Sequence, residues 1–67
     1  MVLSERQKEF VRKCNNDGLV VEEDYSGRGM YGKTCPSVVV DSLSDVSFNP
    51  HDYYVDNMGK GYVIYCR

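Results

Sequence analysis

The chain has 67 residues and a formal net charge of −2, which suits one small domain. Its eight Lys and Arg residues are mixed with ten Asp and Glu residues and form no basic patch, which argues against general binding to nucleic-acid phosphates. The longest aliphatic run is three residues, as at residues 38–40, and the longest run that includes tyrosine and cysteine is five, at residues 62–66; both are far short of the ~20 needed to cross a bilayer.

Three cysteines, Cys14, Cys35 and Cys66, cannot all pair within one chain. The N-terminus lacks the apolar region of a secretory signal, so we expect a reducing, cytoplasmic compartment with all three thiols reduced. A zinc site with His51 is disfavoured, because these four residues lie at least 15 positions apart and structural zinc ligands usually come in close pairs. We therefore expect no metal and no cofactor, with buried cysteines and a histidine at the surface.

Residues 4–14 are predicted to form the first element, a helix. Ser4 suits the N-cap position, and Gln7 three residues later completes a capping box. Phe10 and Cys14 belong to a narrow apolar stripe on one side of this helix. The polar residues that follow end it, with Gly18 available for a left-handed cap.

Two β-strands are predicted in the middle of the chain, over residues 19–24 and 38–40. The second consists of three valines and is expected to be buried. A helix over residues 36–46 is an alternative because apolar residues recur there at helical spacing, but consecutive β-branched residues argue against it. Residues 47–52 contain Asn49 and Pro50 and are predicted to form a turn.

Residues 53–56 and 62–66 are predicted to form a β-hairpin, because the residues between them include glycines suited to positive φ. In the second arm, Val63 and Tyr65 share one face and the other apolar residues share the opposite face. This arm is therefore expected to be buried on both faces or covered by a partner. The predicted fold is a single α+β domain over residues 1–67, with one N-terminal helix packed on a small antiparallel sheet of three or four strands ending in a β-hairpin.

The most distinctive segment is a glycine-rich loop over residues 25–34. Residues 27–34 match the P-loop pattern G-x-x-x-x-G-K-[ST]. A P-loop must be followed by a helix, however, and here Pro36 and three valines follow, so we reject an NTPase function. Three glycines, with Arg28 among them and Lys33 directly after them, still suit a nest of backbone N–H groups that holds an anion. The predicted ligand- or partner-binding residues are Tyr25, Gly27, Arg28, Gly29, Met30, Tyr31, Gly32 and Lys33.

A catalytic set is not evident in the sequence. His51 is the only histidine and lies in the predicted turn, and the carboxylates are scattered. A chain of this length also has little material with which to enclose a pocket, so we predict a protein that is not an enzyme. The six tyrosines suit either a binding surface or a thin, half-exposed core.

The segment D-Y-S-G-R-G-M-Y-G-K-T-C over residues 24–35 resembles a loop found in small accessory proteins of bacteriophages and prophages. The final run, G-Y-V-I-Y-C-R over residues 61–67, is similar to the ends of such proteins, and together the two segments cover roughly a third of the chain. The resemblance implies a protein that binds a host protein, in the manner of inhibitors of bacterial immunity such as anti-CRISPR proteins.

That host-protein binder is the predicted function, and two alternatives stay open. One is a protein that sequesters a nucleotide or cyclic nucleotide through the glycine-rich loop, and the other is a structural or assembly protein. A homo-oligomer is compatible with each, whereas a membrane partner is not expected.

Overall fold

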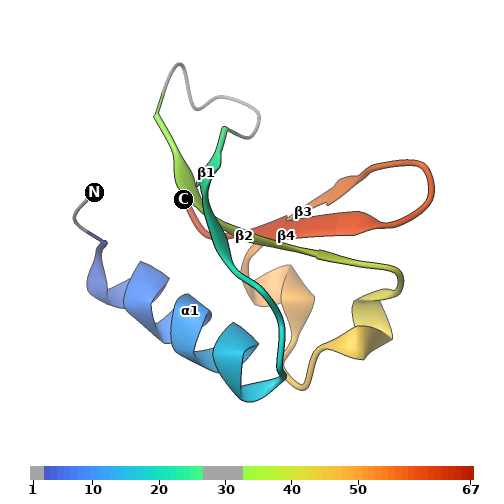
Figure 1. The fold of residues 1–67 in the computed structure, drawn as a ribbon, viewed down its shortest axis with the longest axis horizontal. Coiled ribbons are helices and arrows are strands. Elements are labelled where there is room, and N and C mark those ends of the chain that lie inside the picture. The colour runs from blue at the N-terminus through green and yellow to red at the C-terminus, as the bar shows by residue number, and fades with distance from the viewer. Residues whose placement is uncertain (1–2, 27–32) are drawn as a thin grey trace.

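The computed structural model describes residues 3–26 and 33–67. The elements are the helix α1 (Glu5–Asn16) and the strands β1 (Glu22–Tyr25), β2 (Cys35–Val40), β3 (Tyr54–Asn57) and β4 (Tyr62–Tyr65), with 3₁₀ turns at Leu43–Asp45 and Pro50–Asp52. The sheet has the order β1-β2-β4-β3, and all neighbours are antiparallel. The helix α1 packs against one face of the sheet (Figure 1). The predicted α+β fold, with one helix on an antiparallel sheet that ends in a hairpin, is confirmed.

The start of α1 carries the predicted capping box. The hydroxyl of Ser4 accepts from the backbone N–H of Gln7, and the Gln7 side chain accepts from the backbone N–H of Ser4 at 2.8 Å. The helix continues two residues beyond the predicted end and stops at Asn16. Gly18 then takes a φ of 75°, the left-handed conformation expected of it.

The main core lies between α1 and the sheet. Phe10 is fully buried there, and its ring meets those of Tyr53 and Phe48 edge-on, with centroid distances of 4.8 and 6.1 Å. Burying one phenylalanine contributes about 1.5–3 kcal/mol, so this residue is a central part of a small core. The buried members of the cluster are Phe10, Cys14, Val38, Val40, Val46, Ile64 and Cys66.

The strand predicted over residues 19–24 is placed differently in the structure. It spans Glu22–Tyr25, so Tyr25 belongs to the strand and not to the loop as predicted. The preceding residues connect the end of α1 to the sheet (Figure 1). Leu19 and Val21 pack against the main core, whereas Val20 is 82% exposed. Apolar character in this segment therefore reflects packing against the core more than strand pairing.

The second strand is longer than predicted and includes a proline. It starts at Cys35, and Pro36 lies next to β4 without a backbone N–H to donate. The backbone N–H of Cys66 donates to the carbonyl of Pro36, and the side-chain amide of Gln7 donates to the carbonyl of Cys66, both at 3.2 Å. The Gln7 amide thus supplies the donor that a proline in a central strand cannot.

The predicted hairpin is confirmed, with β3 starting one residue later than expected. Gly59 in the connection has a φ of 85°, as its position predicts. The alternative helix over residues 36–46 is wrong, since the strand β2 reaches Val40 and a single 3₁₀ turn follows. In the part of the chain that the structure describes, no helix has the length and apolar character needed to cross a membrane.

Candidate functional site

The sheet face opposite α1 carries a cluster of aromatic and charged side chains. The register pairs Tyr54 with Tyr65, and Asp56 with Val63, so these side chains project from the same face. Tyr25 reaches this face from β1 and Arg67 from the residues after β4. We call the set of Tyr25, Tyr54, Asp56, Tyr65 and Arg67 the tyrosine face.

The side chain of Tyr25 extends from β1 across the sheet to β3. Its hydroxyl donates to the Asp56 carboxylate at 2.8 Å, and its ring centroid lies 5.0 Å from that of Tyr65. Beneath it, Cys35, Val63 and Tyr65 are at most 3% exposed. Burial, reinforced by the hydrogen bond to Asp56, raises the pKa of Tyr25 to about 12, so the phenol keeps the proton that it donates. Tyr25 therefore packs over a second, smaller core on the sheet face opposite α1.

Tyr54 is the exposed tyrosine of the tyrosine face. It is 44% exposed, and its ring stacks on that of Tyr65 with a centroid distance of 5.4 Å and an angle of 18° between the planes. The guanidinium of Arg67 lies 5.0 Å from the centre of the Tyr54 ring, within the range of a cation–π contact. Tyr54 is thus both accessible to solvent and held in one orientation.

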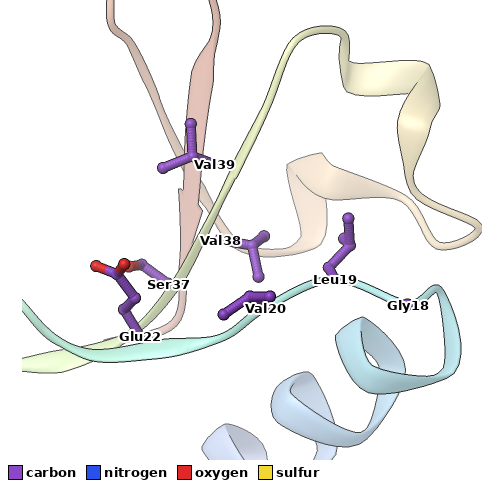
Figure 2. A pocket seen from close by; sticks show the side chains of 7 residues that line it. All are labelled: Gly18, Leu19, Val20, Glu22, Ser37, Val38 and Val39. Carbon is purple, nitrogen blue, oxygen red and sulfur yellow. The ribbon is translucent and has the colours of Figure 1, made fainter.

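A groove opens beside the tyrosine face, between β2 and the segment that leads into β1. It has a volume of about 310 Å³, and Figure 2 shows the seven side chains and backbone positions that line it. Val38 at its base is buried, whereas Val20 and Val39 are 82% and 64% exposed. We call this the β2 groove; its lining residues are Gly18, Leu19, Val20, Glu22, Ser37, Val38 and Val39.

Two of the sequence-predicted site residues can be placed. Tyr25 lies in the tyrosine face, where it contacts Tyr65 and Asp56. Lys33 is exposed two residues before β2. The other predicted residues, Gly27, Arg28, Gly29, Met30, Tyr31 and Gly32, lie outside the described residues. Because β2 starts directly after Thr34, a strand stands where a P-loop would need a helix.

The cysteines and the histidine lie in contrasting environments. All three cysteines are fully buried, as expected, and burial together with the nearby Asp17 charge raises the pKa of the Cys14 thiol to about 12. His51 is exposed in the turn Pro50–Asp52, where its backbone N–H donates to the Asn49 side chain. Among residues 3–26 and 33–67, no three His, Cys, Asp or Glu side chains are grouped so that they could hold a metal ion.

The sequence interpretation did not single out Tyr54, Asp56 or Arg67 as site residues. A signal was present for their face, since the alternation in residues 62–66 puts Val63 and Tyr65 on a second apolar side of the strand. Which residues cover that side depends on the order of the strands in the sheet. The alternation of residues along one strand does not reveal that order. Comparisons of the chain with models of known protein families, with characterised proteins and with solved structures gave no match.

Proposed function

We propose that this protein is a non-enzymatic binding domain that recognises another protein through the tyrosine face. The observation that carries the proposal is the state of Tyr54, which is 44% exposed yet fixed between Tyr65 and Arg67. Tyrosine and arginine dominate the residues that supply binding energy at protein interfaces. A side chain that is already ordered loses little conformational entropy on binding, which favours its use as an anchor.

The chemistry of the buried thiols also supports a binding function over a catalytic one. Nucleophilic cysteines act as thiolates and need a lowered pKa, whereas burial raises the pKa of both Cys14 and Cys66. The exposed His51 belongs to a turn that contacts α1 through the carbonyl of Asp52, which accepts from the Arg6 guanidinium. In this proposal, the two cysteines are structural parts of the core, and His51 belongs to a turn at its border.

The narrower proposal is a phage-type accessory protein whose partner is a bacterial protein. It depends on the resemblance of the glycine-rich loop to loops of such proteins, and it makes bacterial host proteins the first partners to test. In the sequence, this loop connects Tyr25 at the end of β1 to the exposed Lys33, two residues before β2, so Lys33 is a further residue to test for contact with the partner.

The test uses a photo-crosslinking amino acid at position 54 of the tagged full chain, with the same amino acid at the exposed position 8 of α1 as the control. The proposal predicts one protein that crosslinks through position 54, does not crosslink through position 8, and is lost when Tyr25→Phe is combined with Arg67→Ser. Equal crosslinking from both positions would contradict it. A nucleotide that co-purifies in place of a protein would favour the sequestering alternative.

A further inference from the structure

The edge of β2 beyond Ser37 is open toward the β2 groove. The carbonyl of Pro36 accepts from Cys66, and hydrogen bonds to one neighbour alternate along an antiparallel strand. The backbone groups of Val38 and Val40 therefore bond to β4, and those of Val39 point to the opposite side. On that side, β1 pairs with β2 at Glu22 and Ser37. Within the described residues, no hydrogen bond joins Val39 to residues 18–21.

A second observation supports this alternation. The backbone N–H of Met58 donates to the carbonyl of Gly61 at 2.8 Å, which continues the β3–β4 pairing of Asn57 with Tyr62. Odd-numbered residues of β4 thus bond to β3, and even-numbered ones bond to β2. Val39 is paired with Val63, an odd-numbered residue, so its own N–H and C=O are left for the groove side.

The shape of the groove follows from the departure of the chain from β2. If β1 continued backwards in the register of Glu22 and Ser37, Val20 would lie opposite Val39. The chain has turned toward the end of α1 by then (Figure 1), and Leu19 packs against the main core. Figure 2 shows Val38 between Leu19 and Ser37 along this gap. The result is a groove with an apolar base and an unpaired strand edge.

The charged side chain that lines the groove is Glu22, and the two chain segments that supply the lining residues are negative. Residues 17–24 and 36–47 contain six carboxylates and no Lys, Arg or His. Asp17 accepts from the backbone N–H of Ser47, and Asp45 accepts from that of Ser42. The remaining four are exposed, and none of them forms an ion pair within the described residues; they are Glu22, Glu23, Asp24 and Asp41. A second copy of this chain would bring the same charges against them, which disfavours self-pairing at this edge.

We propose that the β2 groove binds an extended segment of the partner protein in which apolar and basic residues alternate, and that this segment adds to β2 as a strand at Val39. This inference rests on the proposed protein-binding function. The N–H and C=O of Val39 bond to the backbone of the segment. Apolar side chains enter the groove over Val38, and basic side chains lie on the face that carries Glu22.

The test measures binding of a fluorescent, end-capped peptide of three Lys-Val repeats to the full chain. A peptide of three Glu-Val repeats is the charge control, and a Lys-Pro version is the control for backbone pairing. The Lys-Val peptide is expected to bind and to slow hydrogen exchange at the Val39 amide. Neither control is expected to bind measurably.

Two variants locate the site. Glu22→Lys reverses an exposed charge at the groove and is expected to weaken Lys-Val binding about tenfold. Glu5→Lys makes the same change on α1, where the side chain is 95% exposed, and is expected to bind normally. Val39→Pro removes a backbone N–H that bonds to none of the described residues, so the variant is expected to fold and to lose the peptide. If this variant does not fold, the effect of Glu22→Lys on binding and the hydrogen-exchange rate of the Val39 amide decide whether the peptide binds in the β2 groove.

The inference is overturned if both charged peptides bind equally or if the Val39 amide is not protected by the Lys-Val peptide. A wild-type dimer that dissociates on Val39→Pro would also overturn it, in favour of a second copy of the chain. Failure of the groove inference can be distinguished from failure of the proposed function. A partner that crosslinks at position 54 and survives Val39→Pro contradicts the groove alone, whereas peptide binding without any such partner contradicts the tyrosine face.

Discussion

The Tyr25 hydroxyl donates to the Asp56 carboxylate at 2.8 Å and thereby joins β1 to β3, the two outermost strands of the sheet. This bond spans two strands that are not neighbours and holds the tyrosine ring over Val63 and Tyr65. It therefore ties the residue that precedes the glycine-rich loop to the far edge of the sheet.

A double-mutant cycle measures this bond. Tyr25→Phe combined with Asp56→Ala is expected to show a coupling of about 1 kcal/mol in the free energy of urea-induced unfolding, the usual net contribution of such a bond. Tyr54→Phe is the matched control, because the Tyr54 hydroxyl forms no hydrogen bond within the described residues. A coupling near zero, or an equal cost at position 54, would show that the bond does not hold the ring.

The same bond predicts how stability depends on alkaline pH. The pKa of Tyr25 rises from 10.0 in the unfolded chain to about 12 in the folded one, so the folded state keeps the proton longer. Its stabilisation is complete below pH 10 and is lost as the pH rises through about 12. The difference in unfolding free energy between wild type and Tyr25→Phe is expected to shrink over this window. A difference that stays constant or grows would contradict the assignment.

Gln7 performs two tasks, and substitutions can separate them. Its side chain accepts from Ser4 in the capping box and donates to the Cys66 carbonyl beside Pro36. Gln7→Glu keeps the acceptor and removes the donor, whereas Gln7→Ala removes both. The expected cost of Gln7→Glu is about 1–3 kcal/mol in thermal or urea unfolding, from an acceptor left without its donor. If Gln7→Glu unfolds like wild type, the Cys66 carbonyl does not need the amide.

Two glycines of the hairpin are predicted to respond differently to substitution. A Cβ at Gly61 would lie 2.6 Å from the Val40 carbonyl oxygen, so Gly61→Ala must move backbone and is expected to cost about 1–3 kcal/mol. At Gly59 there is open space but a φ of 85°, a conformation that asparagine tolerates better than alanine. Gly59→Asn should therefore be more stable than Gly59→Ala, whereas Gly61→Asn should be no better than Gly61→Ala. Unfolding curves of the four variants test this order.

The three buried thiols are expected to react slowly with a thiol reagent in the native protein. Each cysteine is fully buried, and the pKa of Cys14 is raised to about 12, so thiolate becomes available chiefly on opening of the structure. The labelling rate should rise with urea and reach three reacted thiols per chain when unfolded. One thiol that reacts within seconds in the native state would contradict the burial of that residue.

Local signals in the sequence were sufficient for the elements themselves. The Ser4 and Gln7 pair predicted the start of α1, and the three consecutive valines predicted a strand where helical spacing was also present. The start of β1 could not be predicted in this way, because residues 19–21 have strand-like composition yet do not pair, and Leu19 and Val21 pack against the core instead. The position of Pro36 in a central strand could not be predicted from its neighbours in the sequence. The amide that replaces its missing N–H donor comes from Gln7 in α1.

The same distinction between local signals and tertiary packing applies to the candidate site. Composition and alternation determined that the chain carries many tyrosines, that residues 62–66 have two apolar sides, and that the fold is α+β, because periodicity and propensity act between near neighbours. The tertiary structure alone decided that Tyr25 reaches Asp56, that Tyr54 stays exposed between Tyr65 and Arg67, and that β2 keeps an open edge at Val39. These relationships depend on the strand order β1-β2-β4-β3, which sets distant residues side by side and is fixed by packing of the whole chain.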